Sequence, residues 1–338
     1  GECLMSVHAC SRGRLPRLFA GLLAATLLGL GATARAEVKI GYSDWPGWLA
    51  WAIAEQQGFF KKHGASVKLV WFPTYTDSIA ALSAGQVDGN CQTWSDTMAP
   101  LAKGVSLKVV LVNDNSFGND AVMANPKFKS LKDLKGKTVA LEEFSVSHFL
   151  LGIGLAREGM TPRDVKIVNL SAGDAAAAFL SGRVDAATVW NPWVNKIELS
   201  GKGRKLFSSA DAPGLVPDLL VVQEKSLAAN RKDFVGMVKA WYDVEAFIRN
   251  KPEEAVKIMA KIVEMKPEEY KVFLPGTRFF GEKENLEAFG AASQPRSLLN
   301  VAPAVLKFLE DNKLIEGKPD FAKALDASLV KEVAASRK

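Results

Sequence analysis

Thiol and imidazole side chains are scarce in this sequence. Beyond residue 36 there is one cysteine, Cys91, and there are two histidines, His63 and His148. A single cysteine cannot form an internal disulfide, and isolated thiol and imidazole groups leave little for a zinc site or for nucleophilic catalysis. The sequence also lacks a Gly-x-Ser-x-Gly elbow and the Gly-x-x-x-x-Gly-Lys-Ser/Thr pattern of a phosphate-binding loop. We therefore expect no enzyme activity, no metal and no cofactor.

An excess of charge of one sign is also nearly absent. The whole chain carries a formal net charge of +6, but residues 1–36 hold four arginines and one glutamate. The remaining 39 basic and 36 acidic residues give a net charge of +3 and are scattered along the chain. Nucleic-acid binding normally requires a basic patch or stripe, so we expect no nucleic-acid partner. The remaining length, about 300 residues, is enough for two lobes with a core each.

Residues 1–36 have the three parts of a secretory signal peptide. Arg12, Arg14 and Arg17 precede an uncharged apolar run over residues 18–32, and the small-x-small segment 34–36 follows. The apolar run is shorter than the roughly 20 residues that a membrane-spanning helix needs. No cysteine lies at the expected cleavage site near Ala36, which argues against a lipid anchor. We expect a protein of the periplasm.

From residue 37 onward, short strand-like runs alternate with amphipathic helical stretches, and the pattern restarts near residue 138. Such alternation predicts βαβ units with largely parallel sheets. One internal repeat relates residues 82–89 to residues 180–186, each with a helix end, a glycine and a Val-Asp pair that enters an apolar strand. A glycine just past a helix end favours the left-handed conformation that closes the helix. We predict two related α/β lobes.

The candidate ligand site follows from where these strands end. In open α/β sheets a ligand lies beyond the carboxyl ends of the strands, at the helix amino termini. The side chains that the predicted strand ends supply there are Asp44, Trp45, Gln92, Trp94, Asp120, Glu142, Ser145, Ser147, His148, Trp190 and Asn191. Aromatic faces beside carboxylates suit a small cation or a planar nitrogen-rich molecule. Capture of an anion by backbone N–H groups at helix starts stays open, because it needs no basic side chain.

Several of these residues also have a structural interpretation. Trp51 lies three residues from Trp48 and is assigned to the core, while Ser95 and Ser147 have the position of helix caps. His148 fits a buried core histidine as well as a ligand contact. Asp88 and Asp185 occupy turns and are left out of the site, and a purely structural role for Asp96 or Asp120 stays open.

These residues together resemble a known family, the nitrate/taurine/sulfonate (NitT/TauT) substrate-binding proteins of ABC transporters. The motifs that carry the resemblance are Ile40-Gly41-Tyr42, Glu55-x-x-Gly58-Phe59-Phe60-Lys61-Lys62-His63-Gly64, Ala84-Gly85-Gln86-Val87-Asp88, Leu131-Lys132-Asp133-Leu134-Lys135-Gly136-Lys137 and Trp190-Asn191-Pro192. The resemblance implies an α/β fold of the periplasmic binding protein-like type II class, with two lobes, a cleft and two crossover segments. It places lobe 1 at residues 37–122 and 222–338, lobe 2 at residues 123–221, and the crossings near residues 121–125 and 219–223.

Within that family, Gly118-Asn119-Asp120 and the segment 142–148 look most similar to the branch found beside urea-carboxylase-type enzymes, which is associated with guanidine-like substrates. Taurine-type members share the Ser-x-x-His and Trp-x-Pro frame, so the frame leaves the ligand open. A related enzyme group that makes the thiamine pyrimidine relies on a Cys-rich motif, which Cys91 alone does not reproduce.

The resemblance implies a periplasmic receptor that delivers a small polar nitrogen-containing molecule to an ABC permease and its ATPase. A guanidine- or urea-like cation is favoured; the alternatives are a small anion such as an alkanesulfonate, taurine or nitrate, and a thiamine-pyrimidine-synthase-like enzyme. We expect a monomer in which Trp45, Trp94 and Trp190 form the cleft walls. Asp44, Asp120 and Glu142 would supply charge, and polar side chains such as Gln92 and Asn191 would supply hydrogen bonds.

Overall fold

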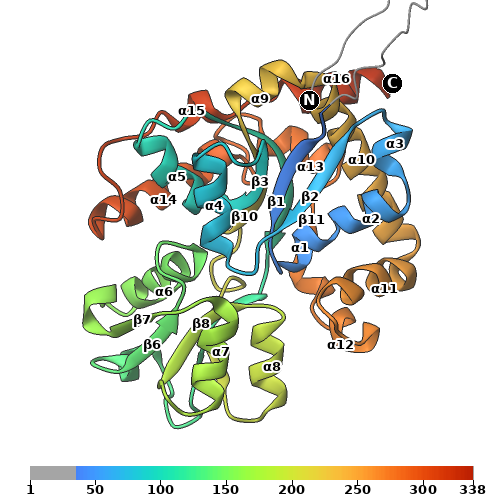
Figure 1. Ribbon diagram of the computed structural model, residues 1–338. Helices are drawn as coiled ribbons and strands as arrows, with labels where there is room; N and C mark the ends of the chain where they lie inside the picture. The colour runs from blue at the N-terminus through green and yellow to red at the C-terminus, as the bar shows by residue number, and fades with distance from the viewer. Residues whose placement is uncertain (1–35, 338) are drawn as a thin grey trace, which may run out of the picture. The chain divides into compact units, whose positions relative to one another are not determined.

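The computed structural model describes residues 36–337, which form two α/β lobes, each built on its own sheet (Figure 1). The expected signal peptide, apart from Ala36, lies outside the described residues. The sheet of lobe 1 has the order β11 (Thr277–Phe279), β4 (Leu107–Ser116), β10 (Pro217–Gln223), β3 (Gly89–Thr93), β1 (Val38–Tyr42) and β2 (Val67–Trp71). The sheet of lobe 2 has the order β7 (Lys166–Asn169), β6 (Thr138–Leu141), β8 (Ala186–Trp190), β5 (Asp120–Ala124) and β9 (Arg204–Ser208).

Helices cover both sheets, and those after β10 return to lobe 1. The helices before and within lobe 2 are α1 (Pro46–Leu49), α2 (Trp51–Gln56), α3 (Phe59–Lys62), α4 (Tyr75–Ser83), α5 (Trp94–Ala102), α6 (Val146–Arg157), α7 (Ala172–Leu180) and α8 (Trp193–Leu199). Those that follow are α9 (Glu224–Ala229), α10 (Arg231–Asn250), α11 (Pro252–Ile262), α12 (Pro267–Lys271), α13 (Glu282–Ala288), α14 (Leu298–Asp311), α15 (Phe321–Ala324) and α16 (Ser328–Ser336). Short 3₁₀ turns lie at Leu131–Leu134, Pro162–Asp164 and Leu274–Gly276.

The two sheets repeat one arrangement, which is mixed rather than largely parallel as the sequence pattern predicts. Three strands of each sheet are parallel, β2-β1-β3 and β7-β6-β8, and the next strand, β10 or β5, pairs antiparallel with its neighbour. That antiparallel strand is the one that enters from the other lobe, because β5 follows β4 and β10 follows β9 along the chain. The passes between sheets therefore lie at residues 117–119 and 209–216, earlier than the crossings expected near 121–125 and 219–223.

The internal repeat marks the same turn in each lobe. Gly85 and Gly182 end α4 and α7 with φ angles of 74° and 75°, the left-handed conformation expected there. The aspartate that follows each turn binds the first of the three parallel strands of its lobe, β1 or β6. Asp88 Oδ2 accepts the backbone N–H of Lys39 at 2.8 Å. Asp185 Oδ2 accepts the backbone N–H and the hydroxyl of Thr138 at 3.1 and 3.0 Å. Both aspartates are therefore structural.

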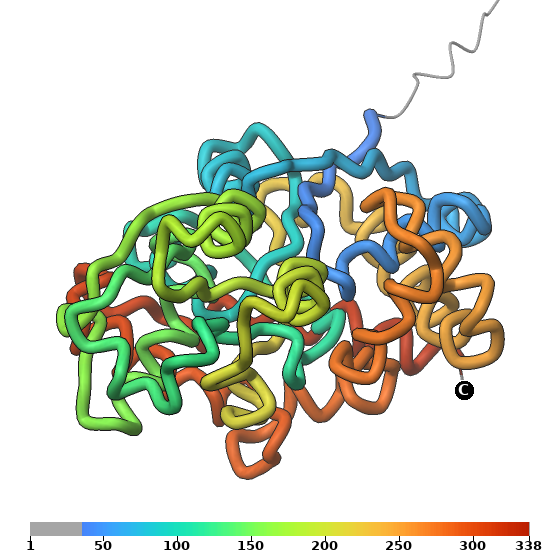
Figure 2. Tube along the Cα trace, turned by 90° about the horizontal axis from the view of Figure 1, so that it is seen from below, coloured from blue at the N-terminus to red at the C-terminus, as the bar shows by residue number. Residues whose placement is uncertain are grey.

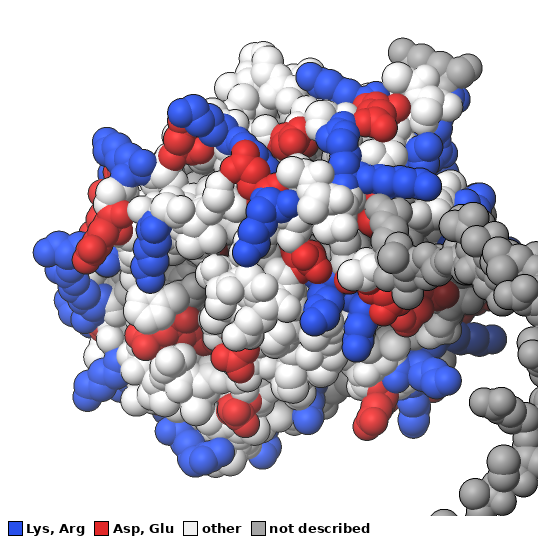
Figure 3. Space-filling view, turned by 45° about the horizontal axis from the view of Figure 1, so that its top comes forward, with Lys and Arg blue, Asp and Glu red and all other residues white. Residues whose placement is uncertain are grey.

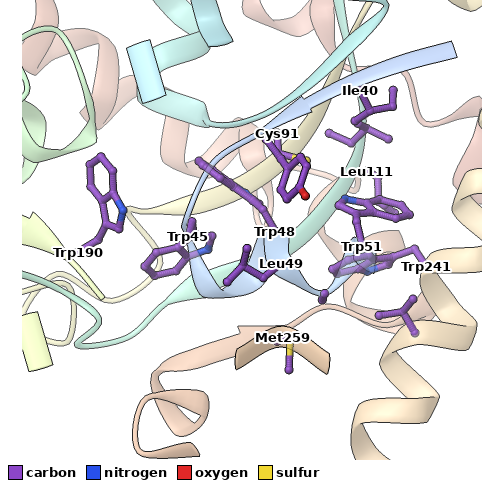
Figure 4. Packing of buried hydrophobic residues seen from close by; sticks show 14 of the residues in the cluster. Ile40, Trp45, Trp48, Leu49, Trp51, Cys91, Leu111, Trp190, Trp241 and Met259 are labelled. Carbon is purple, nitrogen blue, oxygen red and sulfur yellow. The ribbon is translucent and has the colours of Figure 1, made fainter. Parts of the chain in front are cut away.

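The core of lobe 1 lies between its sheet and the helices α2, α10 and α11. Trp51 is fully buried there, stacked on Phe60 at 5.8 Å between ring centroids and tilted against Trp241 at 4.8 Å (Figure 4). This confirms that Trp51 belongs to the core. Trp45 and Trp48 point from the same segment toward Trp190 of lobe 2, so the segment joins the core to the space between the lobes.

The helices after β10 also flank lobe 2. Seen from below, α11 and α12 (orange) lie beside α8 (yellow-green) of lobe 2 (Figure 2). Residues of α8 and α12 line one shared surface hollow. Charges of both signs are interspersed over the face in Figure 3. No helix within residues 36–337 is long and apolar enough to cross a membrane.

Replacing Asp185 by alanine should test the structural role of the repeat. The change leaves the Thr138 N–H and hydroxyl without their acceptor, which should lower the free energy of unfolding by about 1–3 kcal/mol in a urea titration. Glu316→Ala, at an exposed position, is the control and should change it by less than about 0.5 kcal/mol. Equal effects of the two changes would contradict the assignment.

Candidate functional site

Two aspartates face each other at the end of the lobe 1 sheet. Asp218, at the start of β10, is the cross-strand partner of Asp114, near the end of β4, and on its other side pairs with Thr93 of β3. Both carboxyl groups are buried, with 0 % and 2 % of the surface of Asp114 and Asp218 exposed. Like charges directly opposite each other destabilise a sheet. Residues that oppose the stability of the fold are expected at functional sites, so this pair of acids marks a candidate site.

Asp114 is held in place by the turn that follows β1. The indole N–H of Trp45 donates to both of its carboxylate oxygens, at 3.1 and 3.3 Å. A side chain at position 47 would clash with Asp114, since a Cβ on Gly47 would lie 1.8 Å from its Oδ2. The hydroxyl of Tyr270 on α12 donates to the carbonyl of Pro46 at 3.1 Å and supports the turn from behind. The glycine is therefore what lets this turn approach the carboxyl group.

A small cavity, about 210 Å³ when its opening to solvent is included, lies against these residues, where the two lobes meet. Asp120 begins β5 and is paired across the strands with Trp190, which places a carboxyl group and an indole of this segment side by side. Within residues 36–337, the Oδ2 atoms of Asp120 and Asp218 are buried and have no hydrogen-bond partner. The lining of the cavity consists of Trp45, Trp48, Tyr75, Thr93, Asp120, Val146, Trp190 and Asp218 (Figure 4 shows three of its indoles).

The electrostatics of this cavity are acidic. Burial raises the pKa of Asp96 to about 6 and that of Asp120 to about 7. Burial, followed by repulsion from Asp114, raises the pKa of Asp218 well above its usual range. No lysine or arginine of the described chain lines the cavity or forms an ion pair with these carboxyl groups. Burial thus favours the protonated, uncharged forms of these carboxyl groups, because no basic side chain among the described residues is present to offset their ionised forms.

Further carboxylates join the two lobes around the cavity. Asp44 of lobe 1 accepts the indole N–H groups of Trp190 and Trp193 of lobe 2, both at 2.7 Å. Glu142 of lobe 2 accepts the backbone N–H and the hydroxyl of Thr76 of lobe 1, both at 2.7 Å. These hydrogen bonds hold the lobes against each other.

Two of the cross-lobe contacts lie at helix amino termini. The N-cap residue of α4 makes no side-chain cap bond, and Glu142 from the other lobe instead binds Thr76 in the first turn. At the start of α6, the backbone N–H of Val146 donates to Oδ2 of Asp96 from lobe 1 at 3.0 Å. A helix amino terminus is a natural anion site. At α4 and α6 a carboxylate of the protein occupies it.

The structure separates the predicted acidic and aromatic residues into three groups. Trp45, Asp120 and Trp190 line the cavity. Asp44 and Glu142, expected to supply charge to the ligand, bind the opposite lobe instead. Trp94 lies away from the cavity in a separate core cluster, where its indole N–H donates to the carbonyl of Leu298.

The predicted polar residues lie around the cavity rather than in its lining. Gln92 binds neighbouring side chains through the hydroxyl of Thr97 and the amide of Asn90. Asn191 donates to the side-chain oxygen of Asn119 at 2.9 Å, which fixes the segment after β8 to the pass between the lobes. Both amides support the residues that form the site.

The start of α6 carries the remaining predicted residues. Ser145 is the N-cap, since its hydroxyl accepts the backbone N–H of Ser147 at 3.1 Å, whereas Ser147 was the expected cap. The hydroxyl of Ser147 is buried without a hydrogen-bond partner in the described chain. Burial lowers the pKa of His148 to about 4, so this histidine is neutral at pH 7. A neutral imidazole adds no positive charge to the cleft.

Sequence reasoning missed five lining residues, Trp48, Tyr75, Thr93, Val146 and Asp218, and the supporting Asp114. For the two aspartates a signal was available. Asp218 is the one charged residue of β10 and directly precedes its apolar run, and Asp114 lies two residues beyond the apolar run 109–112 of β4. A charged residue is rarely fully buried unless it is paired or functional, so its presence in a buried strand marks it.

Comparisons with known proteins agree with this architecture. A family model described as NMT1/THI5 like matches residues 45–255. The chain is 29% identical over 236 residues to a provisionally named binding protein of Brucella abortus (strain 2308), covering 68% of this chain and 72% of that protein. It is 32% identical over 145 residues to the taurine-binding periplasmic protein of Escherichia coli (strain K12), covering 43% and 45%.

Among solved structures, the alkanesulfonate-binding protein SsuA from Xanthomonas axonopodis pv. citri, bound to MOPS, superimposes with a TM-score of 0.74. Sequence identity is 20%, and the match covers 87% of this chain and 99% of that one. This likeness confirms the predicted α/β fold of the periplasmic binding protein class.

Removing the Asp44 carboxylate should loosen the contact between the lobes. Asp44→Ala leaves the indole N–H groups of Trp190 and Trp193 without an acceptor, which costs about 1–3 kcal/mol each where they stay buried. We expect a larger radius of gyration by small-angle X-ray scattering. The control is Asp243→Ala, which removes contacts to Lys62 and His63 within lobe 1 only and should leave the radius unchanged. An unchanged radius in Asp44→Ala would refute a role of Asp44 in holding the two lobes together.

Proposed function

The chain belongs to the NMT1/THI5 like family, and on that basis we propose that it is the periplasmic receptor of an ABC importer for a small nitrogen-containing cation. The names of its relatives support the receptor class, because they describe binding proteins, one of them periplasmic. The cavity supports the charge of the ligand. Delivery to a membrane permease and its ATPase is the step that such a receptor serves.

The observation that carries this proposal is the pair of unpartnered carboxylate oxygens in an aromatic cavity. Oδ2 of Asp120 and Oδ2 of Asp218 are buried without a partner in the described chain, and Trp45, Trp48 and Trp190 surround them. A buried carboxylate is costly unless a cation or hydrogen-bond donors satisfy it. A cation over an aromatic face is attracted by the ring, and N–H donors with positive charge form strong bonds to carboxylates.

The size of the cavity limits the ligand further. In this structure the enclosed part of the cavity has room for about one water molecule, so a ligand requires the lobes to move apart, and a compact ligand requires the least movement. A flat ion with several N–H donors also matches the arrangement of acceptors. Guanidinium and its small derivatives have these properties, and we propose them as the ligand class.

An anion is disfavoured by what surrounds the same cavity. The first turns of α4 and α6 each already donate a backbone N–H to a carboxylate, that of Glu142 and that of Asp96. A sulfonate in the cavity would face Asp120 and Asp218 with no basic side chain of the described chain in the lining. Repulsion at this depth is strong, since little water screens it.

Catalysis has little support in the described chain. Burial raises the pKa of the Cys91 thiol well above its usual range, so the thiol is not a nucleophile at pH 7. Residues 36–337 contain no group of three or more His, Cys, Asp or Glu side chains arranged to hold a metal ion. The proposal is therefore a receptor that releases its ligand unchanged.

A thermal-shift comparison tests the charge of the ligand. Guanidinium, at concentrations too low to denature and at matched ionic strength, should raise the melting temperature, with a stabilisation of about 2.7 kcal/mol at 100 times Kd. Taurine and propanesulfonate should have no effect. Stabilisation by the sulfonates and none by guanidinium would overturn the cation assignment.

The same assay applied to Asp120→Asn should show which group holds the cation. Loss of one charged hydrogen bond, about 1.5–3 kcal/mol, should weaken guanidinium by about 10- to 100-fold. Asp77→Asn, an exposed aspartate on α4, is the matched control and should bind as the unmodified protein does. Equal binding by the two variants would remove Asp120 from the site.

A further inference from the structure

Asp114 and Asp218 stand directly opposite each other on β4 and β10, and both side chains are buried. Two buried carboxyl groups so close together cannot both be ionised without a counter-charge, so one of the two carries a proton. The indole of Trp45 donates to both oxygens of Asp114, which favours the ionised form there. The proton therefore resides mainly on Asp218, whose carboxyl group lines the cavity.

Resting on the proposed function, we propose that this site exchanges a proton for its ligand: a monovalent cation that binds between Asp120 and Asp218 displaces the proton shared by Asp218 and Asp114. The exchange is balanced. A protonated carboxyl group and a cation become a carboxylate–cation pair, and the proton passes to the solvent. The net charge of the buried site does not change.

Conservation of buried charge is the physical reason for the exchange. Three carboxylates close together in a low-dielectric site cannot all be ionised without a counter-charge. In the ligand-free site a proton supplies the counter-charge. In the occupied site the bound cation supplies it. Asp120 shares this behaviour, because burial raises its pKa to about 7.

The other titratable groups that face the pair cannot supply the proton near pH 7. Tyr75 on α4, Tyr270 on α12 and Cys91 on β3 all have pKa values raised well above their usual range by burial. Asp96 on α5 is bound to the N–H of Val146 and the hydroxyl of Tyr75, and its pKa is about 6. No lysine or arginine in the described chain pairs with Asp114, Asp120 or Asp218. The proton that is released therefore comes from the aspartates of the cavity.

The exchange narrows the ligand class from guanidine- or urea-like molecules to cations alone. A neutral molecule such as urea cannot replace the proton, because the ionised site would be left without a counter-charge. Guanidinium and urea are both planar and similar in size, so the difference in their binding reports charge rather than shape. Affinity for the cation should rise with pH, by up to about tenfold per pH unit for each proton released.

Isothermal titration of guanidinium at about pH 7, in buffers of low and high ionisation enthalpy such as phosphate and Tris, measures the protons released. We expect release of about one proton or more per cation bound, and a smaller value in Asp218→Asn by about one. The amide of that variant can still donate to Asp114 but has no proton to lose. Asp77→Asn should release as many protons as the unmodified protein.

The outcomes separate this inference from the proposed function. Binding of guanidinium without proton release refutes the exchange and leaves the receptor intact. Release that is unchanged in Asp218→Asn refutes the assignment to Asp218. No binding of guanidinium in any buffer refutes the cation receptor itself and the exchange with it. Should Asp218→Asn fail to fold, Asp114→Asn removes the shared proton from the other side of the pair.

The stability of the ligand-free protein provides a second measurement. Asp120 has a raised pKa in the folded state, so its contribution to stability is fully present below about pH 4, the unfolded value. The contribution is lost as the pH rises through about 7. Stability without ligand should therefore fall between about pH 4 and 7, and less so in Asp218→Asn. An equal pH dependence in both proteins would contradict the exchange.

Discussion

A cluster of buried carboxyl groups between the two lobes is the constraint around which the rest of the structure is arranged. Asp96, Asp114, Asp120 and Asp218 all lie below 10 % exposure in a region whose lining contains no basic side chain of the described chain. Hydrogen-bond donors replace counter-ions for part of this charge. The donors are an indole for Asp114, and a helix N–H and a tyrosine hydroxyl for Asp96. The Oδ2 atoms of Asp120 and Asp218 have no such donor in the described chain, and both residues line the cavity.

The repeated architecture explains how so many carboxyl groups meet in one place. In each lobe the antiparallel strand that arrives from the other lobe begins at the carboxyl edge of the parallel strands, because it runs the opposite way. Asp120 and Asp218 stand at the start of these two strands, β5 and β10. The two passes between lobes thus bring one aspartate each to the cleft. A duplicated fold supplies two equivalent positions, and this chain places an acid at or next to both.

The sequence was sufficient to predict the two lobes and part of the candidate site. The reason why a residue could or could not be placed differs from one residue to the next. Strand and helix periodicity is local, so the alternation of elements and the turns at Gly85 and Gly182 could be predicted. Asp120 and Trp190 could be found because they lie at strand ends. Asp114 and Asp218 could not be paired, since their proximity depends on β4 and β10 meeting across a long chain separation. The direction of an incoming strand is likewise absent from its local pattern, which is why the mixed sheets were not foreseen.

Asp44 and Glu142 show a different limit of prediction from sequence. Their positions at strand ends could be predicted, but the groups that they bind could not. A carboxylate at a strand end can meet a ligand or the first turn of a helix in the other lobe, and residue type alone does not distinguish the two. In the structure Glu142 binds α4 and Asp96 binds α6, each across the cleft. A frame of helix amino termini directed at a cleft is inherently suited to anions. Covering those termini with side-chain carboxylates removes the anion site and adds negative charge to the same space. The sign of the ligand that such a frame accepts can thus be set by a few acidic side chains, without any change in the fold.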